Sequence, residues 1–167
     1  RTVHTDPPHW DHHTTSASGL IYLTPLIYQS LVNYFPVRDP ATGKHTVEYI
    51  PVLAKSWENP NDTTWIFRLR EGVKWQNIPP VNGREFTAED VKYSFERIKT
   101  PQPEYAWQSY FTEVDRVEVV DKYTVRFVTK APFAPLLNYI ATPAVAMVAK
   151  EQVEAAKDKK QWLDPVG

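Results

Sequence analysis

The stretch LAKSWENPNDTTWIFRLREGVKWQNIPPVNGREFTAEDVKYSFERI, residues 53–98, decides the fold, because its pattern predicts a strand, a polar turn and a helix in that order. Trp65, Phe67 and Leu69 fall on alternate positions, which is the period-two pattern of a strand that buries one face. Residues 77–83 are rich in asparagine, proline and glycine, which are typical of turns. We therefore expect a half-buried strand that ends in an irregular connection.

A helix is expected over residues 87–98. Thr87 precedes two acidic residues, so its hydroxyl can cap the free backbone N–H groups of the first turn, where the helix dipole also favours negative charge. Val91, Phe95 and Ile98 follow at positions i, i+4 and i+7 and form one apolar stripe. The same pattern places the other charged side chains in solvent: Lys92, Glu96 and Arg97.

The order of residues in this stretch resembles the extracytoplasmic solute-binding proteins of ABC importers, in the class that carries oligopeptides, dipeptides and nickel. Members of that class typically show LA-x-SW, then T-[WY]-x-F-x-LR-x-GVKF, and later TAEDV-x-[FY]-S-x-x-R. The residues that fit are Leu53-Ala54, Ser56-Trp57, Thr64-Trp65, Phe67, Leu69-Arg70, Gly72-Val73-Lys74, Thr87 to Val91, Ser94 and Arg97. The chain departs from the pattern at residues 75–77, where Phe-x-Asp-Gly is usual, and has a longer turn through 79–83.

The resemblance implies a mixed α/β fold that is part of a two-lobe, periplasmic-binding-protein-like architecture with an inserted α+β subdomain of mixed or antiparallel strands. It implies that residues 1–29 belong to lobe one, that residues 30–149 form the inserted subdomain, and that residues 150–167 return toward lobe one. Members of the class are considerably longer than this chain. The sequence is therefore expected to be an N-terminal portion that lacks the second lobe.

Composition and charge narrow the classes of function. The chain has 167 residues, a net charge of −1 and 23% charged residues, which argues against a nucleic-acid partner or an anionic membrane surface. It has no cysteine, which excludes a disulfide framework and a thiolate metal site. No apolar run reaches the ~18 residues of a membrane span. Neither an initiator Met nor a signal peptide is present at Arg1, as expected of a mature or trimmed chain.

Histidines and aspartates gather near the N-terminus, where imidazole and carboxylate groups could bind nickel, copper or zinc. The segment contains His4, Asp6, His9, Asp11, His12 and His13. Two prolines and a tryptophan interrupt the group, and no helical HxxxH pair aims two rings at one point. We therefore predict no stoichiometric nickel or zinc binding, and we expect a surface loop with a structural arrangement of Asp11 and His13.

The next segment contains the first candidate binding residues. Ser16 and Ser18 can cap a helix expected from about Gly19 to Leu31, which Pro25 should bend. In the resembled proteins the loop before this helix reaches the ligand cleft, and a helix start offers free N–H donors to a carboxylate or carbonyl. The candidates are therefore Ser16, Ala17 and Ser18, and a role of the serines limited to capping stays open.

Four aromatic residues follow the proline-rich connection at 100–103: Tyr105, Trp107, Tyr110 and Phe111. Helical spacing would set Tyr105 opposite Trp107, so that one side could face the core and the other solvent. In the resembled proteins the corresponding loop projects toward the cleft and offers an aromatic side chain to the ligand. Tyr105 and Trp107 are therefore candidate ligand-binding residues, with packing between subdomains as the alternative.

The remaining sequence predicts paired strands and short helices. The expected elements are, in order, strands at 31–35 and 46–50, a short helical turn at 51–54, strands at 114–120 and 123–129 joined by a turn at Asp121-Lys122, a helix at 133–140, a strand at 144–148 and a helix from about 150 to 159.

The sequence favours a binding protein over an enzyme. It contains no G-x-S-x-G, P-loop, H-E-x-x-H or G-x-G-x-x-G motif, and the neighbouring carboxylates Glu89 and Asp90 point apart on a helix. The resemblance implies that the protein is the substrate-binding component of an ABC-type importer, which passes an oligopeptide or similar solute to a membrane permease. It also implies a location in the periplasm or, as a lipoprotein, at the cell surface. The protein is expected to act as a monomer and to need no cofactor. The alternatives are a non-catalytic carbohydrate-binding module, which leaves the helix at 87–98 unexplained, and, more distantly, a hydrolase.

Overall fold

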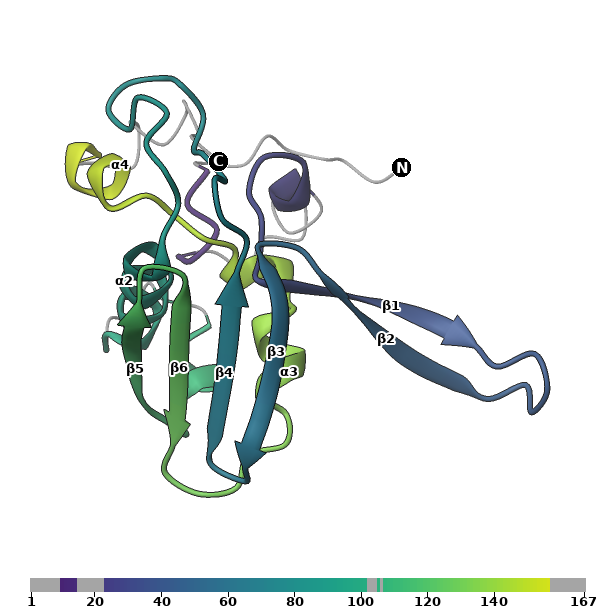
Figure 1. Ribbon diagram of the computed structural model, residues 1–167. Coiled ribbons are helices and arrows are strands. Elements are labelled where there is room, and N and C mark those ends of the chain that lie inside the picture. Colours follow the sequence, from purple (N-terminus) through teal and green to yellow (C-terminus); the bar gives the residue numbers. More distant parts are fainter. Residues whose placement is uncertain (1–9, 15–22, 102–104, 106, 157–167) are drawn as a thin grey trace.

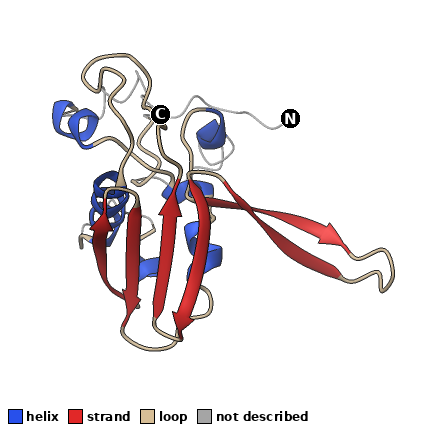
Figure 2. Cartoon of the chain, in the orientation of Figure 1, coloured by secondary structure: helices blue, strands red, loops and turns tan. Residues whose placement is uncertain are grey.

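In the computed structural model, the described residues are 10–14, 23–101, 105 and 107–156. They form a four-stranded antiparallel sheet, a separate two-stranded hairpin and several short helices (Figures 1 and 2). The elements are, in order, η1 (Thr24–Leu26), β1 (Val32–Arg38), β2 (His45–Pro51), β3 (Ala54–Asn61), β4 (Thr64–Leu69), α2 (Ala88–Lys99), η2 (Gln108–Phe111), β5 (Val114–Asp121), β6 (Thr124–Thr129), α3 (Leu136–Ile140), η3 (Pro143–Val145) and α4 (Lys150–Ala155), where η denotes a 3-10 helix. The expected mixed α/β class with antiparallel strands is confirmed.

The four-stranded sheet has the order β3-β4-β6-β5, with every neighbouring pair antiparallel. In Figure 1, α2 and α3 lie behind this sheet, which gives the body two layers. The core between the layers includes four fully buried phenylalanines: Phe67, Phe95, Phe111 and Phe127. Their rings meet edge to face, for example Phe95 and Phe127 with centroids 4.8 Å apart, an arrangement that aromatic quadrupoles favour.

Strand β4 and helix α2 fulfil the predictions made for the deciding stretch. Phe67 and Leu69 are fully buried, while Arg68 between them is exposed. In α2, Val91, Phe95 and Ile98 are fully buried as one stripe. Both elements therefore form where the period of their apolar residues indicates.

The start of α2 also agrees with the prediction, with a more specific cap than expected. Thr87 is the N-cap, and the backbone N–H of Thr87 donates to the carboxylate of Asp90 at 2.9 Å, as in a capping box. One feature of the helix was predicted wrongly. The side chain of Arg97 is only 8% exposed, because it lies against the N-terminal segment and not in solvent.

The hairpin of β1 and β2 projects away from the sheet in Figure 1. Its register pairs Tyr34 with Tyr49 and Pro36 with Val47. The Tyr49 hydroxyl of β2 donates a hydrogen bond to the side chain of Asn138 in α3. The predicted strands at 31–35 and 46–50 are thus confirmed, and both are longer than expected.

Strand β3 was not predicted, and the short helical turn expected at 51–54 is wrong, because β2 ends at Pro51 and β3 begins at Ala54. The β3 sequence AKSWENPN has no apolar alternation, and most of its residues are exposed. Because β3 is an edge strand, it is fixed by backbone pairing with β4, as in the register pair Trp57 and Phe67. Its lysine, glutamate and proline are residues that commonly protect a sheet edge.

The helix expected from about Gly19 to Leu31 ends earlier than predicted in its described part, since Leu23 to Leu26 are helical and residues 27–31 are not. Pro25 lies at the start of the short helix η1, where its missing N–H costs nothing. The chain then leaves helical geometry, and Ser30 donates a hydrogen bond to the oxygen of Val32 at 2.7 Å, where β1 begins. Residues 15–22 lie outside the described residues.

The strand expected at 144–148 is also wrong, although all five residues are buried. This run has no strand partner within the described part of the chain. Its backbone N–H groups instead form hydrogen bonds with a side chain and with the main chain of a loop. Met147 N–H donates to the oxygen of Gln29 at 2.9 Å, and Val148 N–H donates to the Ser94 hydroxyl at 3.0 Å. An apolar run alone cannot distinguish a strand from a buried irregular segment of this kind.

Smaller differences concern element ends. The β5–β6 register pairs Asp121 with Thr124, so the turn residues are Lys122 and Tyr123, one position later than predicted. Asp121 accepts the Tyr123 backbone N–H at 2.8 Å, which fixes the turn. Helix α3 is shorter than predicted.

Among the residues that the structure describes, no helix has the length and apolarity needed to cross a membrane.

Candidate functional site

The half-buried indole of Trp107 joins the loop after α2 to the N-terminal segment. Its Nε1–H donates a hydrogen bond to the main-chain oxygen of His12 at 3.0 Å. Its ring meets Tyr110 edge to face, with centroids 5.4 Å apart, and packs against the rim of the core. Trp107 is therefore neither a fully buried core residue nor a free surface residue, and its ligand-facing role stays a prediction.

Tyr105, the second aromatic candidate, lies over a cation. The guanidinium carbon of Arg97 is 5.1 Å from the centroid of the Tyr105 ring, within the range of a cation–π contact. The two aromatic candidates are thus placed by different groups, Tyr105 by Arg97 and Trp107 by His12. Whether the Tyr105 ring meets a ligand is likewise still a prediction.

Arg97 forms a buried ion pair with Asp11. Arg97 Nη1 and Nη2 donate to the two carboxylate oxygens of Asp11 at 3.0 and 2.6 Å, and the two side chains are 8% and 6% exposed. Nη1 also donates to Nδ1 of His13 at 2.8 Å. Burial strengthens the electrostatic attraction in each of these contacts, because water cannot screen the charges. Arg97 thereby fixes the segment 11–13 on the last turn of α2.

The two imidazoles are fully buried and share one acceptor. Nε2 of His12 and Nε2 of His13 each donate to the main-chain oxygen of Ala146 at 2.9 Å, since a carbonyl oxygen only accepts. Both rings therefore carry their proton on Nε2. Burial lowers the pKa of His12 to about 4 and the pKa of His13 well below its usual value, so both are neutral near pH 7.

We call this group the Arg97 cluster, and its members are Asp11, His12, His13, Arg97, Tyr105 and Trp107. The expected arrangement of Asp11 and His13 is present, since the His13 backbone N–H donates to Asp11 Oδ1 at 3.2 Å. Within the described part of this loop the expected surface position is wrong, because Asp11, His12 and His13 are buried. The described residues include no group of three or more metal-ligating side chains arranged around a common point.

The other predicted residues lie outside the described residues. These are the candidate ligand-binding residues Ser16, Ala17 and Ser18, and the N-terminal residues His4, Asp6 and His9. The structure therefore brings together Tyr105, Trp107 and the pair Asp11 and His13, and leaves the serine segment as a prediction.

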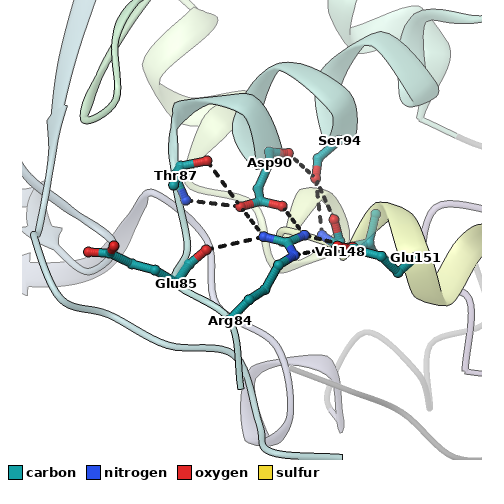
Figure 3. A network of polar contacts seen from close by, with 7 residues as sticks. All are labelled: Arg84, Glu85, Thr87, Asp90, Ser94, Val148 and Glu151. Carbon is teal, nitrogen blue, oxygen red and sulfur yellow. Dashed lines mark hydrogen bonds and ion pairs between the residues drawn. The ribbon is translucent and has the colours of Figure 1, made fainter. Parts of the chain in front are cut away.

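A second arginine cluster lies at the other end of α2 (Figure 3). We call it the Arg84 cluster, and it consists of Arg84, Asp90 and Glu151. Arg84 donates to both carboxylate oxygens of Asp90, at 2.9 and 2.6 Å, and to both of Glu151, at 2.5 and 2.7 Å. Hydrogen bonding from Arg84 lowers the pKa of Glu151 below its usual value. The cluster ties α4 to the start of α2 and contains neither aromatic candidate.

Between the two clusters, Ser94 joins α2 to the segment before α4 (Figure 3). Its hydroxyl donates to the main-chain oxygen of Asp90 at 2.8 Å and accepts a hydrogen bond from the backbone N–H of Val148. Asp90, Ser94 and Arg97 follow at positions i, i+4 and i+7, so they share one side of the helix. Helix α2 therefore has a buried polar stripe beside its apolar stripe, and the polar stripe holds the N-terminal segment and the segment before α4.

A cavity of about 300 Å³ opens elsewhere in the fold. Its lining includes Trp75 and Phe86, whose rings meet with centroids 5.7 Å apart, together with Leu53, Ile27 and Met147. Most of the residues around it have apolar side chains, but Gln29, Lys74 and Gln76 also line it, and polar atoms form much of its accessible wall. It contains no member of the Arg97 cluster, so the cavity and the aromatic candidates are different places in the described structure.

Sequence reasoning missed Arg97 as part of the site. A signal was available, because Asp90, Ser94 and Arg97 repeat the i, i+4, i+7 spacing that identified the apolar stripe. A helix with two adjacent stripes of this kind packs on two partners. The contact with Asp11 could not be found in this way, since the two residues are 86 positions apart.

Comparison with known proteins gives the family context. Residues 48–167 match the model of the bacterial extracellular solute-binding proteins, family 5, middle part. A curated dipeptide-binding protein of Escherichia coli (strain K12) is 36% identical over 139 residues, which cover 73% of this chain and 26% of that protein.

Solved structures agree in fold. The ABC transporter-associated periplasmic binding protein DppA from Helicobacter pylori, in complex with the peptide STSA, superposes with a TM-score of 0.78 at 26% identity, over 97% of this chain and 33% of that one. NikA from Brucella suis, in complex with Fe(III)-EDTA, gives 0.73 at 28% identity, over 96% and 30%. The chain thus spans about a quarter of the curated relative and about a third of these structures.

Proposed function

The chain belongs to family 5 of the bacterial extracellular solute-binding proteins, and we propose on this basis that it is part of the substrate-binding component of an ABC-type importer. In this proposal the full-length protein captures a peptide or similar small solute outside the cytoplasmic membrane and delivers it to the permease. The observation that carries the proposal is the 36% identity with a dipeptide-binding protein over 139 residues.

The proposed mechanism is capture by closure. A ligand that contacts two lobes only when they are closed shifts the equilibrium from the open to the closed form, by as much as its affinities for the two forms differ. In this division of the chain, residues 1–29 and 150–167 belong to lobe one, and residues 30–149 form the inserted subdomain. The packed core between the four-stranded sheet and α2 would then serve as a rigid support for the closing surfaces.

The residues proposed to meet the ligand are Tyr105, Trp107 and the segment 16–18. Aromatic rings with one edge held by the protein offer a large apolar surface at low entropic cost, which suits the side chains of a peptide. Main-chain N–H groups and hydroxyls of Ser16, Ala17 and Ser18 suit its carbonyl or carboxylate groups. Support comes from the half-buried position of Trp107 and Tyr105, since each ring retains an exposed part.

The named relatives are binding proteins, and we infer that this chain likewise catalyses no reaction and needs no cofactor. We further propose that the protein is located in the periplasm or anchored as a lipoprotein, acts as a monomer and docks on an ABC permease. In this proposal it binds no nucleic acid and, by itself, no metal ion. The small net charge of −1 supports the absence of a nucleic-acid partner.

Calorimetric titration of the full-length protein tests the proposal. The probes are dialanine, the tetrapeptide Ser-Thr-Ser-Ala, Ni²⁺ alone and a disaccharide. We expect one peptide site with a Kd of about 10 μM or tighter, equivalent to about −7 kcal/mol, and no binding of the metal or the sugar. Binding of the disaccharide alone would replace the proposal with a carbohydrate-binding role, and binding of Ni²⁺ alone would replace it with metal capture.

The aromatic residues are tested in the same titration. Trp107→Ala should weaken peptide binding by about tenfold or more, which corresponds to about 1.4 kcal/mol. The control is Trp57→Ala, a change of another half-buried tryptophan, on strand β3 and outside the Arg97 cluster. Unchanged affinity of the Trp107 variant, together with a large loss of stability, would assign Trp107 to the core.

A further inference from the structure

Arg97 contacts three groups with three different parts of one guanidinium. The edge formed by Nη1 and Nη2 binds Asp11, at 3.0 and 2.6 Å. Nη1 also reaches Nδ1 of His13 at 2.8 Å. The face of the group lies 5.1 Å from the centroid of the Tyr105 ring. These contacts need a planar group with several fixed donors, so an ammonium group of the same charge cannot make all of them together.

The contacts of Arg97 extend to both aromatic candidates. Tyr105 is reached directly, through its ring. Trp107 is reached through the segment 11–13, because Asp11 and His13 hold this segment on Arg97 and the oxygen of His12 receives the Trp107 Nε1–H at 3.0 Å. Arg97 is therefore connected to both rings, directly to Tyr105 and through the segment 11–13 to Trp107, which also packs against Tyr110.

The surrounding structure keeps Arg97 itself in place. Its side chain is 8% exposed, and it projects from the same side of α2 as Asp90 and Ser94, which are tied to Arg84 and to Val148. A long side chain on the surface would lose conformational entropy when it ordered a ligand-binding ring, but the entropy of Arg97 is already lost on folding. Such preorganisation raises the affinity for a ligand without adding a contact to it.

We propose that Arg97 is a positioning residue for ligand binding, which orients Tyr105 by its guanidinium face and Trp107 through Asp11 and the main chain of His12. The inference rests on the proposed peptide-binding function and deepens it. Arg97 does not touch the ligand in this proposal. Its effect on affinity therefore passes entirely through the two aromatic side chains.

The main experiment compares two matched variants of the full-length protein, Arg97→Lys and Arg84→Lys. Both arginines hold an aspartate through two hydrogen bonds at the same helix, and only Arg97 contacts the aromatic candidates. Titration with Ser-Thr-Ser-Ala or dialanine should show binding weakened by about tenfold for Arg97→Lys, or about 1.4 kcal/mol. For Arg84→Lys the Kd should stay within about twofold of the unchanged protein.

A double-mutant cycle separates positioning from a general structural effect. Tyr105→Leu and Trp107→Phe leave the buried ion pair intact, and each should weaken binding by about threefold to tenfold. In the Tyr105→Leu, Trp107→Phe background, adding Arg97→Lys should change the Kd by less than about twofold. A purely structural role would instead give the same loss of affinity in both backgrounds.

The outcomes are distinct. Loss of affinity that is confined to Arg97→Lys and disappears in the aromatic double variant supports the inference. Unchanged affinity of Tyr105→Leu and Trp107→Phe, in a protein that binds the peptide, overturns the inference and leaves the proposed function standing, even where Arg97→Lys fails to fold. Absence of any peptide binding by the unchanged protein overturns the proposed function and this inference with it.

Discussion

The two arginine clusters use the same chemistry at opposite ends of α2, and they differ in burial. In the Arg97 cluster, the side chains of Arg97 and Asp11 are 8% and 6% exposed. In the Arg84 cluster, Asp90 is 4% exposed, but Arg84 and Glu151 are 32% and 39% exposed. Water screens a charge pair more strongly the more exposed the pair is, so the arginine–aspartate hydrogen bonds, which are similar in length, differ in strength between the two ends.

Burial has two consequences that point in opposite directions. A buried pair loses the hydration of both ions when it forms, so its net contribution to stability is small when it is complete. When one partner is removed, however, the other charge stays buried without compensation. The Arg97 cluster should therefore respond strongly to single substitutions, whereas the Arg84 cluster should tolerate them.

Removal of the Asp11 charge should have the largest effect. Asp11→Asn removes the carboxylate that accepts two hydrogen bonds from the buried Arg97 guanidinium, which should lower the free energy of unfolding by about 3–5 kcal/mol. The matched variant Asp90→Asn leaves Glu151 as a partner for the more exposed Arg84. It should cost about 1–2 kcal/mol, including the weakened helix cap. Urea denaturation followed by tryptophan fluorescence measures both, and equal losses would contradict the contrast between the clusters.

The two clusters should also titrate in different pH ranges. Burial lowers the pKa of His12 from 6.5 to about 4, so the unfolded chain binds this proton first as the pH falls. Stability from this group is complete above pH 6.5 and is lost as the pH falls toward 4, by about 3 kcal/mol at pH 4. Glu151 has a lowered pKa, so its contribution is complete above its usual pKa of 4.5 and is lost only below that value.

Denaturation at a series of pH values tests this difference. His12→Gln should make the profile shallower between pH 6.5 and 4, because the amide carries no titrating proton. Part of the slope should remain, because burial also lowers the pKa of His13, which is still present. The control is His45→Gln on the exposed hairpin strand β2, which should keep the unchanged profile. A profile that keeps its slope in the His12 variant would show that other groups cause the acid sensitivity.

The same contrast separates what the sequence could predict from what it could not. Helix α2, β4, β5 and β6 were predictable because their apolar residues repeat with the period of the element, and burial of that face fixes them. The polar stripe of α2 was predictable in principle from the spacing of Asp90, Ser94 and Arg97. Its partners were not, because Asp11 and Val148 come from distant parts of the chain.

The elements that sequence reasoning missed lack such a periodic signal. Strand β3 is polar and exists because β4 offers it a free edge, which local sequence does not encode. The run 144–148 is apolar but forms no strand, because Ala144 and Val145 belong to η3, and Ser94 and two histidines bind backbone groups of Val148 and Ala146 in place of a neighbouring strand. The aromatic candidates were predicted from their position after a proline-rich connection and from the resemblance, and their role stays a prediction, whereas the contacts of Arg97 emerge only from the tertiary structure.

Ser94, between the clusters, should give an intermediate effect. Ser94→Ala removes the acceptor of the buried Val148 N–H and should cost about 1–3 kcal/mol, the desolvation penalty of an unpaired donor. Thr100→Ala is the matched control, because Thr100 also donates to the carbonyl four positions earlier, but in an exposed place. It should cost a few tenths of a kcal/mol, or about 0.5 at most. A similar cost at both sites would show that Val148 finds another partner.

Loss of the Glu151 charge should have the smallest effect. Glu151→Gln removes one of the two carboxylates on Arg84, but Asp90 remains at 2.6 Å and water reaches the guanidinium, which is 32% exposed. The cost should be below about 1 kcal/mol, as for other partly exposed ion pairs. Because salt screens exposed charges, the difference from the unchanged protein should shrink further in about 1 M NaCl, where the Debye length is about 3 Å. Asp11→Asn should keep its full cost in the same salt, since solvent does not reach that pair. A Glu151 effect above about 2 kcal/mol, or an Asp11 effect that salt abolishes, would mean that burial does not distinguish the two clusters.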